Sequence, residues 1–439
     1  MNRPIGIDLF AGVGGMSIGF EQAGFDVLAA VEIDPIHAAA HAYNFPETTV
    51  INQSVETITG ADIREMAGIG ERDVDVVFGG APCQGFSLIG KRALDDPRNS
   101  LVRDFVRIVS ELDATHFVFE NVKGITVGKH RAFLEELIAE FQGHGYEVVL
   151  PWKVLNASAF GVPQNRERLI LMGTKRGRLR PEYPLPITRA AGSVGEAPEG
   201  PSCADALSDL PDAERFEGLH HSDTVATSTW GTPSEYGQEM RCRTNESWHF
   251  GYVRCWEPNV LTSSARTEHT AISRRRFKET LPGEVEPISR FFRLPAKGVS
   301  NTLRAGTDAA RGAFTSPRPI HYKFDRCITV REMARLHGFP DWFRLHQTKW
   351  HGARQVGNAV PPPLARAVAG AVIAALGVTP ERPARSLKLG DAQLLGMTME
   401  SAARHFGKTF KVVRRNTKSG AKKRKQSEIE ADRLQLAAD

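Results

Sequence analysis

One cysteine stands in a turn that is unusual for a buried thiol. Cys83 follows Pro82 in Gly79-Gly80-Ala81-Pro82-Cys83-Gln84-Gly85-Phe86-Ser87, directly after the apolar run 74–78. A single cysteine in a long chain is more often an inert core residue. A Gly- and Pro-rich segment at the end of a strand, however, is poor core material and is typical of a catalytic loop. A thiolate there could act as a nucleophile.

Acidic and basic side chains follow near two further strand-like runs. Glu120 ends the run 117–120 and would lie at the same sheet edge as Cys83. A partly buried carboxylic acid can share a proton with a base ring, although capping of the next turn is an equally open role. Arg166 and Arg168 precede the run 169–172 and lie on one face by the period of two. Turned inward they could donate to a carbonyl or phosphate; otherwise they are ordinary exposed residues.

A glycine-rich turn follows the first apolar run. It reads Asp8-Leu9-Phe10-Ala11-Gly12-Val13-Gly14-Gly15, and its glycines allow close approach of a ligand to the backbone. Alone it fits a nicotinamide, a flavin, S-adenosylmethionine or merely a tight turn. Glu32 ends the next strand about 20 residues later, where a carboxylate can accept from ribose hydroxyls. Together they indicate an adenosine-type cofactor.

A sheet must position these residues. Apolar runs alternate with helix-spaced stretches up to residue 174, which predicts an α/β fold: a doubly wound, Rossmann-like domain with a parallel sheet. The predicted strands are 5–10, 27–33, 74–78, 117–120, 147–150 and 169–172. The predicted helices are 16–23, 35–44, 101–111 and 130–142.

The composition changes after residue 174. Pro, Gly and Ser dominate at first, and aromatic and basic residues then interleave up to residue 317, as on many nucleic-acid surfaces or on a solvated face. Helical spacing resumes at 329–337 and 361–376. We therefore expect a catalytic and cofactor-binding domain (1–174), a smaller second domain (175–317), a return to the first (318–380) and a basic, mobile tail (381–439) that holds DNA loosely or is only solvated.

Net charge, cysteine content and the distribution of apolar residues narrow the class of protein. The net charge of +5 suits a polyanionic partner without requiring one. Five cysteines without a CxxC pair argue against a disulfide framework and for the cytoplasm. No signal-like start or membrane-length apolar run is present, so we expect neither secretion nor membrane insertion. We expect no metal, because the spacing of the only candidate ligands is irregular: His220, His221, Cys242, His249 and Cys255.

Taken jointly and in this order, the motifs resemble the DNA (cytosine-5)-methyltransferase family of the bacterial restriction-modification type. The resemblance spans nearly the whole chain except the middle segment and the tail. It is carried by Asp8 to Gly15, Val31-Glu32-Ile33-Asp34-Pro35, Gly79 to Ser87, Glu120-Asn121-Val122, Gln164 to Arg168, Thr329-Val330-Arg331-Glu332-Met333-Ala334-Arg335-Leu336, and Gln355-Val356-Gly357-Asn358-Ala359-Val360-Pro361.

The resemblance implies S-adenosylmethionine as cofactor and duplex DNA as substrate. Cys83 would attack C6 of a flipped cytosine. Glu120 would contact N3 and the exocyclic amine, and Arg168, supported by Arg166, would hold O2. The middle segment takes the place of the family's target-recognition domain.

The resemblance also implies the binding residues. The cofactor would be held by Asp8, Phe10, Gly12, Gly14, Gly15, Glu32, Ser54, Pro82, Leu101 and Asn358. Ser54 stands near the place where many members carry an acid that contacts adenine, and would replace it. DNA would be contacted by Gln84, Ser87, Lys91, Arg92, Gln164 and Arg304, although a purely structural turn at Arg304 is equally open.

Other functions remain to be weighed. A tRNA cytosine-5 methyltransferase of the same family would not need the large middle segment. A non-catalytic DNA-binding protein would not need Cys83, Glu120 and Arg168, and a nicotinamide oxidoreductase rests on the glycine-rich turn alone. We expect a monomeric enzyme of the nucleoid that works beside a cognate endonuclease without stable contact, although a solitary regulatory methyltransferase would look the same.

Overall fold

The computed structural model describes residues 3–82, 99–127, 130–307 and 316–409. Five predicted site residues lie outside the described residues: Cys83, Gln84, Ser87, Lys91 and Arg92. Pro82 is the last described residue before that gap, and it is exposed.

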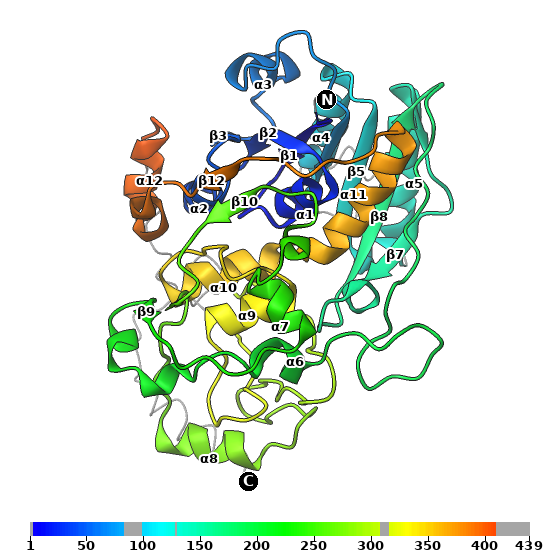
Figure 1. Cartoon of the computed structure of the whole chain (residues 1–439). Coiled ribbons are helices and arrows are strands. Elements are labelled where there is room, and N and C mark those ends of the chain that lie inside the picture. Colours follow the sequence, from blue (N-terminus) through cyan, green and yellow to red (C-terminus); the bar gives the residue numbers. More distant parts are fainter. Residues whose placement is uncertain (1–2, 83–98, 128–129, 308–315, 410–439) are drawn as a thin grey trace, which may run out of the picture.

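A single mixed sheet forms the centre of the molecule (Figure 1). Its order is β3-β2-β1-β4-β5-β8-β6, with β7 also paired to β8. The strands are β1 (Ile5–Leu9), β2 (Asp26–Val31), β3 (Thr49–Ile51), β4 (Val76–Gly79), β5 (His116–Val122), β6 (Tyr146–Val148), β7 (Lys153–Asn156) and β8 (Glu167–Lys175). Because the strand order reverses at the β1/β4 pair, ligands are expected at the carboxyl ends of these strands.

The doubly wound fold is confirmed, and the predicted parallel sheet is confirmed from β3 to β5 but is wrong for β8 and its partners. The pairs from β3 to β5 are parallel, whereas β8 runs antiparallel to β5, β6 and β7. No α-helix separates β6, β7 and β8, and strands that lack a long crossover pair antiparallel.

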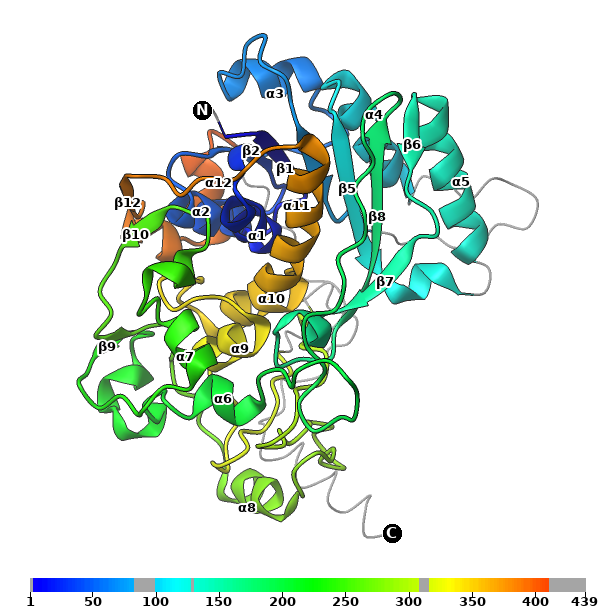
Figure 2. The ribbon, with the colours of Figure 1, turned by 45° about the vertical axis from the view of Figure 1, so that its right-hand side comes forward.

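Helices bury both faces of this sheet. On one face α1 (Gly15–Ala23) packs beside α11 (Pro362–Leu376), so a segment far along the chain closes the first core (Figure 2). The other face is covered by α3 (Gly60–Met66), α4 (Ser100–Glu111) and α5 (His130–Gly143). Phe78 and Val118 belong to one core and Val77 and Phe119 to the other, as the alternation of side chains along a strand requires.

The middle segment shares a core with its neighbours. Leu207, Met240 and Trp248 of this segment pack in one cluster with Ile36 and Trp342. The elements that meet there or nearby are α2 (Pro35–Asn44), α6 (Cys203–Leu207), β9 (Val225–Ala226), α7 (Glu235–Met240), β10 (Val253–Cys255), β11 (Val260–Leu261), α8 (Ala271–Glu279), α9 (Val330–His337) and α10 (Lys349–Asn358). Short 3-10 helices link them and the sheet: Lys123–Thr126, Ala157–Phe160, Ala213–Arg215, Glu217–His220, Asn245–Trp248 and Ala392–Gly396.

The prediction of a mobile tail from residue 381 is contradicted over the part of that segment that the structure describes. Strand β12 (Ser386–Lys388) pairs with β10, and α12 (Met399–His405) packs on α2. Leu394 and Leu395 are buried in the shared core. The prediction is therefore wrong for 381–409, because a few apolar side chains anchor a segment whose composition is otherwise polar.

Among the described residues, one stretch is long and apolar enough to cross a membrane by length and composition. It is the run Lys349–Leu376, which comprises α10 and α11, and 56% of its most apolar window is buried. Packing of α11 against α1 accounts for that apolar character. The same described residues contain no group of three or more His, Cys, Asp or Glu side chains arranged to hold a metal ion.

Candidate active site

The turn that leads to Cys83 is fixed to the neighbouring strand. Asn121 Nδ2, on β5, donates to the carbonyl oxygen of Ala81 at 2.9 Å. A Cβ atom on Gly80 would lie 2.4 Å from Glu120 Oε2. The carboxylate of Glu120 therefore lies directly against the backbone of the Pro-Cys turn, as the sequence predicted for this edge.

Glu120 is paired with Arg168 across the antiparallel strands β5 and β8. Arg168 Nε lies 2.7 Å from Glu120 Oε1, and the two side chains are only 12% and 13% exposed. The guanidinium also donates from Nη1 to the carbonyl oxygen of Glu167. A carboxyl group and a guanidinium thus sit side by side at the rim of the turn. This arrangement can exchange a proton with a ring nitrogen and hold a carbonyl oxygen.

Arg166 lies behind this pair and is 1% exposed. Its guanidinium donates to the carbonyl oxygens of Leu303, Gly357 and Ala359 at 2.8 to 3.0 Å. Burial, followed by the neighbouring charge of Arg168, lowers the pKa of Arg166. Arg166 therefore positions the start of β8 against the end of α10. Its predicted supporting role toward Arg168 stays a prediction.

The prediction that Gln164 contacts DNA is wrong. The side chain is fully buried. Its Nε2 donates to the carbonyl oxygen of Leu336 at 3.2 Å, and its Oε1 accepts from the backbone N–H of Leu303 at 3.0 Å. A polar residue in a motif looks available for a ligand, but here it satisfies backbone groups that would otherwise be buried without partners.

We expect Gly80→Ala to lower the methyl transfer that the resemblance implies at least tenfold without unfolding the protein. The new Cβ would meet the carboxylate oxygen of Glu120 at 2.4 Å, so that side chain must move away from Arg168. A misplacement of about 1 Å can cost about 100-fold in rate. Steady-state methyl transfer and the thermal unfolding midpoint would be measured together. Gly124→Ala, where a Cβ meets nothing within 4 Å, is the matched control.

The glycine-rich turn after β1 has the backbone geometry of a ligand cradle. Phe10, Gly12 and Gly14 adopt positive φ angles of 59°, 56° and 101°. For Phe10 this left-handed conformation is unfavourable and must be imposed by its surroundings. Gly14 caps α1 without a side-chain hydrogen bond, which leaves the positive end of the helix facing the turn. A Cβ on Gly15 would lie 2.5 Å from the carbonyl oxygen of Val360.

Glu32 is fixed at this turn by two backbone amides. Gly12 N–H donates to Oε2 and Asp34 N–H donates to Oε1, each at 2.8 Å. The side chain is 8% exposed. Burial raises the pKa of Glu32 above its ordinary value. Since each carboxylate oxygen retains a second lone pair, Glu32 can still accept from a pair of ribose hydroxyls.

Asp8 is buried beneath the glycine-rich turn, where it contacts α1. It is 1% exposed and accepts a hydrogen bond from Ser17 Oγ at 2.6 Å. Burial raises the pKa of Asp8 to about 8, so the carboxyl group is mostly protonated at neutral pH. We predicted that Asp8 contacts the cofactor directly. A side chain that is buried in this way is not available for that contact. Asp8 is a positioning residue that ties β1 to α1.

The remaining predicted cofactor residues lie around this edge. Asn358, at the end of α10, is exposed and adjoins the turn that touches Gly15, and Leu101 is half-buried near the start of α4. Ser54 Oγ donates to Glu56, which also accepts from Ser100 Oγ. This acid, two residues after Ser54, lies close to where an acid was expected.

Ile33 is a candidate that the sequence reasoning missed. It follows Glu32 and is 64% exposed, which is unusual for an apolar side chain. Asn52 Nδ2 donates to the carbonyl oxygen of Ile33, and Asn52 Oδ1 is buried without a hydrogen-bond partner. The available signal was an apolar residue between two carboxylates just after a strand end.

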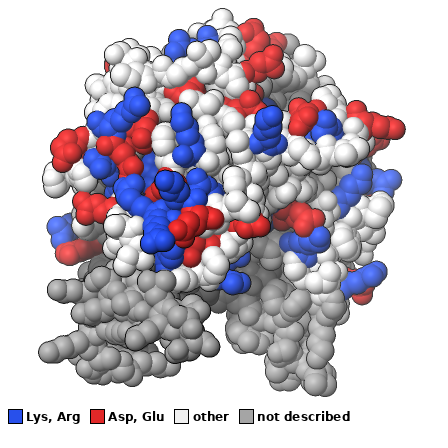
Figure 3. All heavy atoms as spheres, turned by 90° about the horizontal axis from the view of Figure 1, so that it is seen from below, with Lys and Arg blue, Asp and Glu red and all other residues white. Residues whose placement is uncertain are grey.

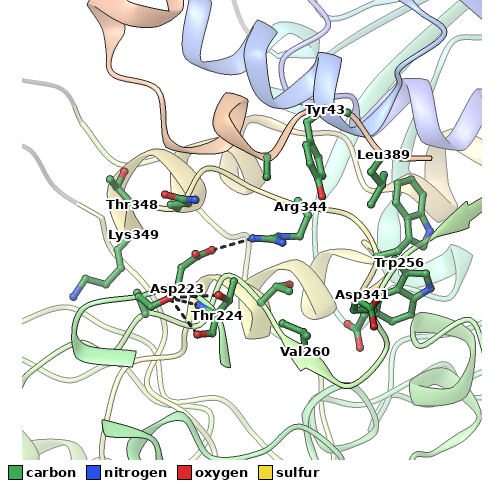
Figure 4. A pocket seen from close by; sticks show the side chains of 18 of the residues that line it. Tyr43, Asp223, Thr224, Trp256, Val260, Asp341, Arg344, Thr348, Lys349 and Leu389 are labelled. Atoms are coloured by element: carbon green, nitrogen blue, oxygen red, sulfur yellow. Dashed lines mark hydrogen bonds and ion pairs between the residues drawn. The ribbon is translucent and has the colours of Figure 1, made fainter. Parts of the chain in front are cut away.

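The cavity in Figure 4 is separate from the Glu120–Arg168 pair and from the glycine-rich turn. It measures about 1150 Å³ and lies between α2, the middle segment and the stretch around Gly390. Arg344 and Asp223 face each other within it at 3.7 Å, and Tyr43 and Trp256 also line it. Glu32, Glu120 and Arg168 do not line this cavity. Size alone therefore does not identify the active site.

Comparison with known proteins decides the family. Residues 5–374 match the family model described as C-5 cytosine-specific DNA methylase. The chain belongs to this family. It is a DNA (cytosine-5-)-methyltransferase of the Type II restriction-modification kind.

Its relatives support this assignment along nearly the whole chain. The Type II methyltransferase M.XorII of Xanthomonas oryzae pv. oryzae is 56% identical over 95% of this chain and 96% of its own. M1.HphI of Haemophilus parahaemolyticus is 34% identical over 84% of this chain and 86% of its own.

Solved structures share the fold of this chain. A prophage-encoded E. coli protein described as a DNA modification methyltransferase superposes with a TM-score of 0.68 at 31% identity, covering 85% of this chain and all of its own. The Dnmt2 methyltransferase of S. pombe, at 15% identity and a TM-score of 0.51, covers 86% of the methylase and all of its own chain, and shares the fold.

Proposed function

We propose that this methylase transfers a methyl group from S-adenosylmethionine to C5 of a flipped cytosine in a specific duplex DNA sequence, through a covalent bond between Cys83 and C6. The contact of the Glu120–Arg168 pair with the turn that leads to Cys83 carries the proposal. A cytosine seated there would place N3 and its amine toward Glu120 and its O2 toward Arg168.

The chemistry follows from the poor nucleophilicity of C5. The Cys83 thiolate adds to C6 while Glu120 delivers a proton to N3, which turns the ring into an enamine whose C5 is electron-rich. S-adenosylmethionine supplies the methyl group at C5. A base then removes the C5 proton, the thiolate leaves C6, and Glu120 takes back its proton. The cytosine must leave the helical stack for these groups to reach it.

The cofactor edge fits S-adenosylmethionine. Glu32, held by two amides, would accept from the ribose hydroxyls. Phe10 and the turn from Gly12 to Gly15 would surround the methionine and adenosine parts, and Ile33 offers an apolar surface beside the ribose position. Pro82, Ser54, Leu101 and Asn358 would complete the walls.

The surface charge of the protein bears on its proposed DNA substrate. Lys and Arg side chains cluster on the lower face with acidic side chains beside them (Figure 3), and α8 with Arg274, Arg275, Arg276 and Lys278 lies at the lower end of the molecule (Figure 1). Such a face favours duplex DNA. We infer that residues 175–317 read the target sequence. We also infer that the enzyme is a monomer in the bacterial cytoplasm and protects host DNA from an endonuclease that it does not bind stably.

The first test is direct. Purified protein with labelled S-adenosylmethionine is expected to methylate duplex DNA, and bisulfite sequencing of plasmid DNA from expressing cells is expected to reveal one methylated sequence. Duplex DNA should also outcompete tRNA as the methyl acceptor. DNA binding without methyl transfer would instead indicate a non-catalytic protein.

We expect Cys83→Ser to abolish methyl transfer, because a serine hydroxyl is not ionised where a thiol partly is. Single-turnover transfer of labelled methyl groups would measure it, with DNA binding retained. Cys255→Ser is the matched control, since Cys255 is an exposed cysteine of the middle segment and its loss should leave the rate unchanged. Equal rates for Cys83→Ser and the parent would exclude the covalent route.

A further inference from the structure

Three polar side chains are almost completely buried where β8 begins. Gln164 and Arg166 lie in the turn before the strand, and His337 is the last residue of α9. Their exposed fractions are 0%, 1% and 0%. Helix α9 packs against α10 (Figure 1), so His337 reaches the turn that follows α10. Polar groups buried this deeply are costly unless they are hydrogen-bonded, so their bonds bear on their role.

The imidazole of His337 bridges two segments. Nε2 lies 3.0 Å from the carbonyl oxygen of Ala359, and Nδ1 lies 3.0 Å from Nε2 of Gln164. A carbonyl oxygen can only accept, so Nε2 carries the ring proton and Nδ1 accepts from the Gln164 amide. Burial, followed by the charge of Arg166, lowers the pKa of His337 well below its ordinary value. The ring is therefore neutral and held in a single tautomer.

Gln164 extends this set of hydrogen bonds in one direction. Its Nε2 also donates to the carbonyl oxygen of Leu336 at 3.2 Å, and its Oε1 accepts from the N–H of Leu303 at 3.0 Å. If the amide oxygen and nitrogen were interchanged, two donors would face each other at Leu303 and two acceptors at His337. The neutral ring and the Leu303 amide together fix the orientation of Gln164.

Arg166 binds the same two segments. Nη1 donates to the carbonyl oxygen of Leu303 at 3.0 Å, and Nη2 donates to those of Gly357 and Ala359 at 2.8 and 2.9 Å. Leu303 and Ala359 lie outside helices and strands, so side chains provide these bonds. His337 and Arg166 thus occupy both lone pairs of the Ala359 carbonyl oxygen. The direction of this carbonyl group is fixed from two sides.

Ala359 lies next to the glycine-rich turn. A Cβ on Gly15 would lie 2.9 Å from the Cβ of Ala359 and 2.5 Å from the carbonyl oxygen of Val360. Asn358, which precedes Ala359, is exposed at the proposed cofactor edge. Rotation of the backbone at Ala359 would therefore move Asn358 and press on the start of α1.

We propose that His337 is a positioning residue for the cofactor, because its hydrogen bond to Ala359 holds the wall that carries Asn358. Through Gln164 the same ring ties this wall to the start of β8. The inference rests on the proposed function, which assigns S-adenosylmethionine to this edge. His337 is fully buried, so it acts only through these neighbours. An apolar side chain of this size could fill the same space; the two hydrogen bonds are what the imidazole adds.

The experiment measures, by calorimetry on the full chain, the binding of S-adenosylhomocysteine, which remains when the cofactor has lost its methyl group. His337→Leu removes both hydrogen bonds and is expected to weaken binding about tenfold, because buried polar partners lose a bond. Methyl transfer at saturating cofactor should fall less, because Arg166 still donates to Ala359. His337→Gln supplies an acceptor and a donor in place of Nδ1 and Nε2 and should retain most of the affinity.

His116→Leu is the matched control. His116 is 1% exposed, and its Nε2 lies 3.1 Å from the carbonyl oxygen of Leu179. It begins β5, at the opposite end of the strand from Glu120. This variant should lower the thermal midpoint about as much as His337→Leu does and leave the affinity for S-adenosylhomocysteine unchanged.

A second variant serves if His337→Leu does not fold. In His337→Asn the side-chain oxygen can accept from Gln164, but the side chain is too short to reach Ala359. It should therefore weaken binding of S-adenosylhomocysteine as His337→Leu would.

Unchanged affinity in His337→Leu, or in His337→Asn where that variant replaces it, would overturn the proposal. Equal weakening by His337→Gln and His337→Leu would overturn it as well, because the shape of the ring and not its hydrogen bonds would then be required. An equal loss in His116→Leu would assign the effect to general destabilisation. If the parent protein neither bound S-adenosylhomocysteine nor transferred methyl groups, the proposed function would fail and this inference with it.

Discussion

Substitution of Glu120 by glutamine is expected to lower methyl transfer by about 100- to 10,000-fold, the usual contribution of a positioned acid. The amide has the same shape and keeps an oxygen that can accept from Arg168 Nε, now 2.7 Å away. It cannot deliver a proton to N3 of the ring. Addition of the thiolate to C6 would then have to build negative charge on the ring without compensation.

The measurement is single-turnover methyl transfer with DNA in excess over its dissociation constant. The unfolding midpoint should move little, because the substitution changes no volume. Glu167→Gln is the matched control: it is the neighbouring glutamate on β8, 47% exposed and paired with Lys123 at 2.9 Å. A rate for Glu120→Gln within about threefold of the control would remove Glu120 from the proton-transfer step.

Much of this edge could be predicted from local patterns. The bounds of α2, Pro35–Asn44, were predicted correctly because Asp34 accepts from two amides of the first turn and Pro35 begins the helix. The runs that form β1, β4 and β5 were readable as apolar segments that stop at glycines or, for β5, at Glu120 and Asn121. Since parallel strands bring these ends together, the placement of Glu120 at the edge of the Pro-Cys turn could be predicted, although capping of the next turn was an equally open role for it.

Several of the errors share one physical cause, which is a partner far away in the chain. Gln164 and Arg166 look like exposed polar residues, but the carbonyl groups and amide that they bind belong to Leu303 and Gly357. Burial of Leu394 and Leu395 depends likewise on the core formed by α2 and the middle segment. No local pattern reports which backbone groups a tertiary contact will leave without partners.

The same distant contacts hold the middle segment to the catalytic core. Arg326 joins Asp212 of the middle segment to Glu332 of α9, and Arg254 is paired with Glu21 of α1 at 2.7 Å. Buried ion pairs at such a junction add little net stability, but they are favourable only when the two side chains keep one relative position. These ion pairs therefore fix the middle segment, which we propose to read the DNA sequence, relative to the catalytic edge.

Arg335 is the most deeply buried member of these networks. It lies on α9, is fully buried, and donates to Asp209 of the middle segment at 3.0 Å and to Asp341 at 2.7 Å. Removal of this one cation would leave two buried carboxylates, of which Asp341 keeps Arg331 at 3.8 Å and the more distant charge of Arg241. We expect Arg335→Met to destabilise the protein by about 3 to 5 kcal/mol, the usual result of breaking a buried pair from one side.

Urea unfolding followed by circular dichroism would measure the loss, and limited proteolysis should show earlier cleavage in residues 175–317. Arg404→Met is the control, since its partner Glu400 is on the surface and the Arg404 side chain is 76% exposed; it should change stability by less than about 1 kcal/mol.

The decisive comparison adds Asp209→Leu and Asp341→Leu to Arg335→Met. If the cost arises from uncompensated charge, the triple variant should recover most of the lost stability, because well-packed apolar side chains can replace a buried ion pair. No recovery would mean that the hydrogen bond from Arg335 to the carbonyl oxygen of Ala206, or the shape of the guanidinium, holds the junction instead of the charge.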